Sequence, residues 1–175
     1  MIDIPIKINI INHSKRLIKE INFGNRGFAD GNKRQQYIGI VGENVIRDYL
    51  GIKLIEFKNE FDGGYDINWN TYKADVKTME RKVQPTLEYV NNVLDTQMNY
   101  QANAFIFCSI NSKTKILTIC GWITKKKFKE LASYYPKGST RKRNDNTTFE
   151  LHSGNWEIKN ENLYKFYKLD FEKNY

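Results

Sequence analysis

The sequence lacks any apolar run long enough to span a bilayer. Its longest, Ala104 to Cys108, has the length of a strand, whereas a membrane helix needs roughly 18 or more apolar residues. The N-terminus, Met1 to Pro5, carries an early acid and no continuous apolar segment, so it does not resemble a secretory signal. We therefore expect a cytoplasmic protein with no membrane partner.

Cysteine and histidine are scarce, with two of each in the chain. Cys108 and Cys120 lie in apolar runs without C-x-x-C spacing, so we expect reduced core thiols rather than a disulfide or a zinc site. His13 and His152 stand alone, with no further metal ligands beside them. The chain also lacks a glycine-lysine phosphate loop, a G-x-S-x-G element and internal repeats. These absences leave the carboxylates as the candidate catalytic groups.

A surplus of basic residues is the main feature of the composition. The 175 residues include 28 Lys and Arg against 20 Asp and Glu, which gives a formal net charge of +8. This surplus favours a polyanionic partner such as DNA, although a basic soluble protein without such a partner has the same composition. Hydrophobic residues make up 40% of the chain, as in globular proteins, and the length favours one domain spanning residues 1–175.

The segment from Phe61 to Thr78 reads FDGGYDINWNTYKADVKT and predicts a β-hairpin with its turn near Asn68 to Thr71. Residues two apart in a strand project from the same face, so Asp75 and Lys77 should point together. Asp66 begins the preceding strand and should lie across the hairpin from Asp75. Two carboxylates this close repel each other unless a cation or a proton joins them.

This arrangement of oxygen ligands suits Mg²⁺ or Mn²⁺. Magnesium is normally bound by one or two carboxylates, with waters and substrate phosphate completing its coordination shell. Lys77 would then orient or deprotonate an attacking water, or neutralise the charge that grows on a phosphorane. The predicted reaction is hydrolysis of a phosphodiester bond.

At these residues the sequence resembles the PD-(D/E)xK nuclease superfamily, the restriction-endonuclease-like phosphodiesterases. Asp66 matches the first acid of the motif, and the run Asp75-Val76-Lys77 matches its D/E-x-K element. Glu43, in GIVGENVIRDYLG, matches the acid that many members carry on the helix before the hairpin. The order of these elements, helix acid, hairpin acid and then D-x-K, strengthens the resemblance.

One position departs from the family pattern, and one acid is ambiguous. Tyr65 stands where the family name has proline, a residue that many members lack. Asp62 is an alternative first acid, because FDGGYD offers two. We favour Asp66 because it adjoins the strand and a glycine pair separates it from Asp62.

The resemblance implies an α/β fold with a restriction-endonuclease-like core, in which helices flank a mixed central β-sheet. The core would span about residues 36–123, and residues 124–175 would form a basic C-terminal extension. The protein would be a metal-dependent DNA endonuclease, and such enzymes commonly act as homodimers when they cut both strands. A junction resolvase, a homing or phage nuclease and a catalytically inactive DNA-binding module of the same fold are the alternatives.

The resemblance also implies a role for each site residue. Asp66 and Asp75 would ligate the metal ion, together with the main-chain carbonyl of Val76. Glu43 would ligate a second ion or hold a metal-bound water. Lys77 would position the attacking water or stabilise the transition state.

Hydrophobic periodicity predicts the other elements of the chain. The clearest helix runs from Gln35 to Leu50, ends at Gly51, and has at Gly42 a place for close approach to a neighbour. Strands are expected at 2–11, 53–57, 104–110 and 115–123, and helices at 14–21, 87–103 and 124–133. Gln97 and Tyr100 loosely match a glutamine and a tyrosine that some family members carry on the helix after D-x-K.

Two groups of basic residues are candidate DNA contacts. Arg81 and Lys82 directly follow the strand that carries Lys77, in a predicted polar connection at 79–85. The predicted loop 134–146 combines basic residues with two tyrosines, a mixture that suits a phosphate-binding groove. Its basic residues are Lys137, Arg141, Lys142 and Arg143.

Overall fold

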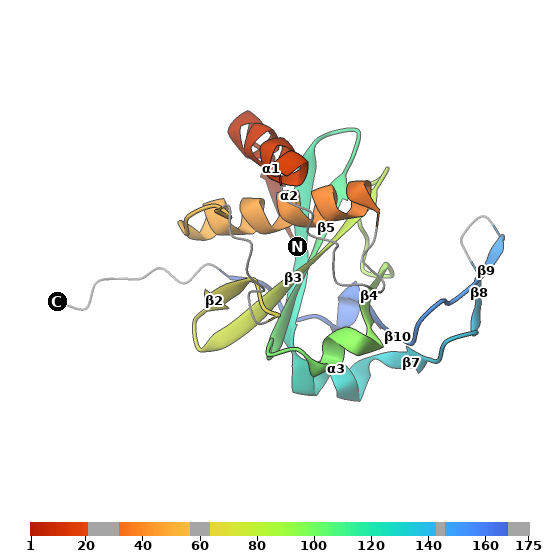
Figure 1. The fold of residues 1–175 in the computed structure, drawn as a ribbon. Helices are drawn as coiled ribbons and strands as arrows, with labels where there is room; N and C mark the ends of the chain where they lie inside the picture. The colour runs from red at the N-terminus through yellow and green to blue at the C-terminus, as the bar shows by residue number, and fades with distance from the viewer. Residues whose placement is uncertain (21–31, 57–63, 143–145, 168–175) are drawn as a thin grey trace.

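The structure, a computed structural model, describes residues 1–20, 32–56, 64–142 and 146–167. Its centre is a curled five-stranded sheet with helices packed against it (Figure 1). The strand order is β1-β6-β5-β3-β2, with β3 parallel to β5 and all other neighbours antiparallel. The strands are Ile2–Pro5 (β1), Ile67–Trp69 (β2), Tyr72–Arg81 (β3), Ala104–Asn111 (β5) and Ile116–Thr124 (β6). The expectation of a mixed α/β fold is confirmed.

Strand β5 lies at the centre of the protein and is buried along its whole length. Its side chains alternate between two hydrophobic clusters, as the period of a strand requires. Ile106 and Cys108 join the cluster beneath helix α2 (Lys33–Leu50), whereas Phe105 and Phe107 join the cluster beneath helix α3 (Lys125–Leu131). This burial on both faces explains the continuous apolar run in the sequence.

Helix α2 confirms the prediction for residues 35–50. Asn32 caps its N-terminus and forms a capping box with Gln35, while Gly51 ends it in the left-handed conformation with φ 73°. Gly42 meets β3 closely, because a Cβ at this position would lie 1.9 Å from Thr78 Oγ1. Only glycine lets α2 lie this near the sheet at that point.

The N-terminal strand is shorter than predicted. β1 ends at Pro5, on the edge of the sheet as the proline suggested. Residues 8–11, expected to continue the strand, instead begin helix α1, Ile8–Glu20, which includes most of the helix predicted at 14–21. Ile10, Ser14 and Leu17 are the buried residues of α1, with the spacing of one helical face. The alternating isoleucines therefore serve a strand and then a helix.

The prediction of a helix at 87–103 is wrong. Val90–Leu94 forms strand β4, and Asp95–Asn99 forms a 3-10 helix, η1. β4 pairs with β10, Asn155–Lys159, so its partner lies far away in sequence and leaves no local signal. The predicted polar connection at 79–85 is also partly wrong, because β3 continues to Arg81. Residues 52–56 form no strand, and Phe57 lies outside the described residues.

In the C-terminal part of the chain, the helix predicted at 124–133 is present as α3, whereas strands lie in the segment predicted as a loop. Thr124 caps α3 by accepting a hydrogen bond from Lys127 N, as expected. The segment predicted as the loop 134–146 instead contains strands, and a hairpin of two of them projects from the body as an arm (Figure 1). The strands here are Ser133–Tyr135 (β7), Thr140–Lys142 (β8) and Thr148–Glu150 (β9).

Two further expectations concern cysteine and membranes. Cys108 and Cys120 are buried free thiols, as predicted, and burial raises the pKa of Cys120 to about 11. Neither thiol is therefore a nucleophile at neutral pH. Within the described ranges, no helix has both the length and the apolar character needed to cross a membrane.

Candidate active site

The predicted hairpin exists and sets the positions of the acids. Ile67 pairs with Ala74 and Trp69 with Tyr72, which leaves Asn70 and Thr71 as the turn. Asn70 adopts the left-handed conformation, φ 54°, that such a tight turn requires.

Asp66 lies where β2 begins and where one edge of β3 opens. Its main-chain N–H donates to Ala74 O at 2.9 Å, and its carboxylate Oδ2 accepts from Val76 N at 2.7 Å. Beyond Ala74, the pairing of β3 with β2 stops, so this carboxylate satisfies a donor on an otherwise open strand edge. The Val76 carbonyl lies along the same edge, because the two main-chain polar groups of one strand residue point the same way.

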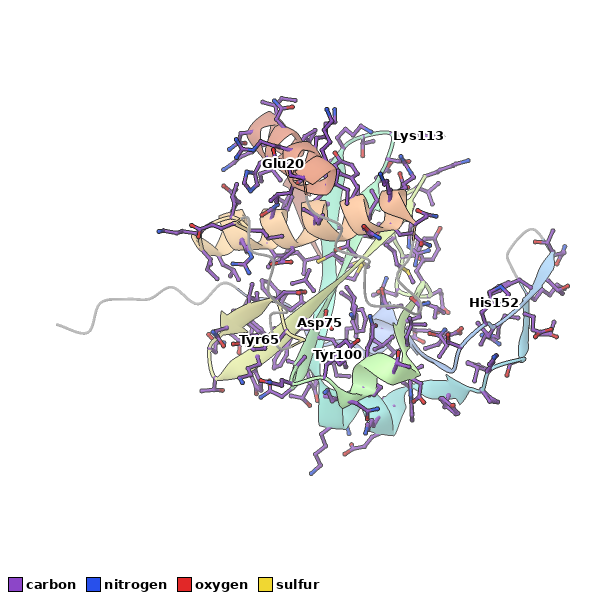
Figure 2. All side chains as sticks on the ribbon, viewed as in Figure 1. Glu20, Tyr65, Asp75, Tyr100, Lys113 and His152 are labelled. Atoms are coloured by element: carbon purple, nitrogen blue, oxygen red, sulfur yellow. The ribbon has the colours of Figure 1, made fainter. Side chains whose placement is uncertain are left out.

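Asp75 and Lys77 project from the same face of β3, as predicted. Lys77 Nζ lies 2.7 Å from Asp75 Oδ2. Asp75 is 7% exposed, and Figure 2 shows it near the middle of the molecule. A nearly buried carboxylate next to an ammonium group is the arrangement that the D-x-K spacing indicated.

Glu43 reaches this region from α2, and Arg47 links it to the hairpin. The Glu43 side chain is 15% exposed and accepts from Arg47 Nε at 2.6 Å. Arg47 Nη2 also donates to the main-chain oxygen of Asp66 at 2.5 Å. Our sequence analysis missed Arg47, although its position four residues after Glu43 on a helix was the available signal.

Electrostatics confirm that the acids share one region. The pKa of Asp66 is raised well above 3.8, first by burial and then by the negative charges of Glu43 and Asp75. Lys77 and the Val76 N–H act in the opposite direction but do not cancel these effects. The structure therefore brings Glu43, Asp66, Asp75 and Lys77 together from α2, β3 and the start of β2.

The oxygen atoms of these acids are ligands of the kind that a divalent cation such as Mg²⁺ prefers. In the part of the chain that the structure describes, no three Asp, Glu, His or Cys side chains are gathered as ligands of one ion. Mg²⁺ needs only one or two carboxylates, and Asp66 and Asp75 supply the hard oxygen donors it prefers. Burial and the nearby charges of Glu43 and Asp75 raise the pKa of Asp66, so a cation bound there would favour its ionised form.

A cavity of about 170 Å³ lies beside Lys77. Gln97 lines it from η1, so this residue lies near the candidate site even though its predicted helix is absent. The other lining residues are Thr78, Met79, Asn91, Asn92, Leu94 and Phe107. Besides the Lys77 ammonium, the polar lining consists of three side-chain amides and one hydroxyl, which bind by hydrogen bonds.

The predicted DNA contacts fall into two groups. The two arginines of the first group contact other residues of the protein. Arg81 lies over the Tyr89 ring at 4.6 Å and donates a hydrogen bond to Val90 O. Arg141 lies over the Tyr135 ring at 3.7 Å and forms an ion pair with Glu157. The second group consists of exposed lysines without an ion pair to any described residue: Lys82, Lys137 and Lys142. Arg143, like the alternative acid Asp62, lies outside the described residues.

Comparison of the chain with protein-family models, with curated proteins and with solved structures found no match in any of the three. The case for a function therefore rests on the residues described above.

The raised pKa of Asp66 predicts how its replacement changes stability with pH. A carboxyl group whose pKa is higher in the folded state stabilises the fold below its unfolded pKa, and this contribution is lost as pH rises through the folded pKa. Asp66→Asn removes the charge and keeps an oxygen for the Val76 N–H. In EDTA, we expect the variant to gain thermal stability relative to the wild type as pH rises from about 4 to 7.

Melting temperatures of both proteins across this pH range, measured by circular dichroism, check the prediction. A difference between them that stays constant or shrinks with rising pH would contradict the electrostatic strain assigned to Asp66.

Proposed function

We propose that this protein is a Mg²⁺-dependent DNA endonuclease that hydrolyses phosphodiester bonds by the PD-(D/E)xK mechanism. The observation that carries the proposal is that Asp66, at the open edge of β3, lies beside Asp75 and Lys77, which project from one face of that strand, with Lys77 Nζ 2.7 Å from Asp75. A cluster of like charges is costly to keep, and a metal ion with a phosphate substrate makes use of it.

The order of elements supports a restriction-endonuclease-like core. Helix α2 carries Glu43, the β2–β3 hairpin carries Asp66 and Asp75, and β5 follows parallel to β3. The connection between β3 and β5 consists of β4 and η1 rather than the expected helix. This connection lies outside the hairpin, so it leaves the acids and Lys77 in place.

Each residue of the proposed site has a distinct task. Asp66, Asp75 and the Val76 carbonyl would hold the metal ion, which supplies Lewis acidity and lowers the pKa of a bound water. Lys77 would orient the attacking water or stabilise negative charge that develops on the phosphate oxygens. Glu43 would hold a water or a second ion, and Arg47 keeps its carboxylate oriented toward the hairpin.

DNA is the proposed substrate because the chain carries a net charge of +8, and because three of its exposed lysines form no ion pair with a described residue. Lys82 follows the end of β3, and Lys137 and Lys142 lie on the projecting arm. Arg141 would position the arm rather than touch DNA, since it is bound to Glu157 and Tyr135. Cutting both strands of a duplex would take two copies of the site, which is the reason to propose a homodimer.

The test is a cleavage assay with labelled duplex, four-way junction and single-stranded DNA, each in Mg²⁺, Mn²⁺ and EDTA. We expect cleavage with either metal and none in EDTA. Preferred cutting of the junction would assign the protein to the junction resolvases. Binding of DNA without cleavage under every condition would refute the nuclease and indicate an inactive DNA-binding module.

A further inference from the structure

A basic groove lies between helices α1 and α2, away from the carboxylates. Its volume is about 460 Å³. Helix α1 contributes Lys15, Ile18 and Lys19, and the first turns of α2 contribute Lys33, Arg34 and Tyr37. Positions 15, 18 and 19 share one face of α1 by their i, i+3, i+4 spacing, so both lysines point toward α2. We call these six residues the α1–α2 groove.

Most of the positive charge in this groove has no ion-pair partner among the described residues. Arg34 pairs with Glu80 of β3, with its Nε 2.7 Å from Glu80 Oε2. Lys15, Lys19 and Lys33 are exposed and form no ion pair with a residue in the described segments. Like charges at i, i+4, such as Lys15 and Lys19, repel each other weakly, and an anion bound in the groove would relieve this repulsion.

Tyr37 and Ile18 give the groove an apolar floor. Tyr37 is partly buried, and burial raises the pKa of its hydroxyl, which therefore stays protonated and can donate a hydrogen bond at neutral pH. The N-terminal amides of α2 are not the source of binding here, because Asn32 and Gln35 already cap the helix. Side chains alone supply the donors: three ammonium groups, one guanidinium and one phenol.

We propose that the α1–α2 groove binds the sugar-phosphate backbone of nucleic acid; this inference rests on the proposed function. The groove is larger than one phosphate needs, and several cations along two helices suit a chain of phosphates. Arg34 precedes Glu43 by nine residues of the same helix, which at 1.5 Å per residue is about 13 Å. At 3.6 residues per turn these two positions are half a turn apart, so the α1–α2 groove and the carboxylates lie on different sides of α2.

The first experiment measures binding without chemistry. Fluorescence anisotropy with a labelled duplex in EDTA, over a series of salt concentrations, compares the wild type with two triple variants at positions 15, 19 and 33. The Lys→Gln triple should bind roughly tenfold or more weakly and lose about 0.9 of salt slope per phosphate contact removed. The Lys→Arg triple keeps the charge and should match the wild type. Equal affinities and slopes in all three proteins would overturn the proposal.

A second experiment locates DNA on the unmodified protein. Lysine acetylation followed by mass spectrometry should show protection of Lys15, Lys19 and Lys33 by duplex DNA in EDTA. Protection by inorganic tripolyphosphate but not by DNA would overturn the proposal and indicate a site for a small polyphosphate. Protection by DNA in a protein that never cleaves would refute the nuclease and leave the groove standing, so the two failures are distinguishable.

Discussion

Replacing Lys77 by alanine is expected to lower DNA cleavage in Mg²⁺ by roughly 10²–10³-fold, the loss seen when one preorganised charge-stabilising donor is removed. Lys77 is the cation that lies 2.7 Å from Asp75, on the face of β3 beside the edge where Asp66 binds the Val76 N–H. Removing its amine takes away the group that orients the water or offsets phosphate charge. Single-turnover cleavage with enzyme in excess separates this effect from a change in affinity.

The matched control is Lys73→Ala on the same strand. Lys73 lies four residues before Lys77 on the same face of β3, and it donates to Gln101 and lies over the Tyr65 ring rather than pairing with an acid. We expect it to cleave within a few-fold of the wild type. Asp75→Asn should match the loss of Lys77→Ala, with DNA binding in EDTA retained by all three variants. Wild-type cleavage by Lys77→Ala in Mg²⁺ would remove Lys77 from the mechanism.

Gly42→Ala is expected to destabilise the protein by about 1–3 kcal/mol through overpacking. A Cβ at this position would lie 1.9, 2.7 and 2.8 Å from three atoms of the Thr78 side chain, so helix and sheet must separate. For a chain of this size the melting temperature should fall by roughly 2–4 °C per kcal/mol. Cleavage should fall as well, because α2 carries Glu43 and Arg47 toward the hairpin.

Gly39→Ala on the same helix is the control. A Cβ there meets nothing within 4 Å, so we expect the ordinary gain from replacing a mid-helix glycine, about 0.5–1 kcal/mol. Adding Thr78→Ala to Gly42→Ala should restore part of the lost stability, since it removes the nearest atom, Oγ1, which is buried without a hydrogen-bond partner. Equal melting temperatures for Gly39→Ala and Gly42→Ala would show that α2 does not pack on β3 as described.

Elements that are specified by residues close together in the sequence could be predicted from the sequence. Helix α2 was predictable because its apolar stripe, the glycine that ends it at Gly51 and the close contact at Gly42 all lie within one segment. The hairpin was predictable because its two strands are adjacent in sequence, and the two-residue turn between them sets their register. That register alone places Asp66 opposite the Asp75 end and puts Lys77 on the face of Asp75.

Elements that depend on a partner far away in the sequence could not be predicted from the sequence. Strand β4 reads as a helix until β10, more than fifty residues later, supplies its hydrogen bonds. The alternation of residues 2–11 predicts a single strand, yet packing against α2 turns its second half into α1. In the sequence, Arg81 and Arg141 look available to bind DNA. In the fold, Arg81 lies over the Tyr89 ring, and Arg141 lies over the Tyr135 ring and forms an ion pair with Glu157.

By itself, the sequence determined the helix with Glu43, the hairpin with its two aspartates and lysine, and the basic character of the chain, since each depends on spacing or composition. Only the tertiary structure decided that these acids share one region, that Arg47 joins Glu43 to Asp66, and that Arg81 and Arg141 bind within the protein. The physical reason is that charge interactions depend on distance through space, and α2 and β3 acquire that distance only by packing together.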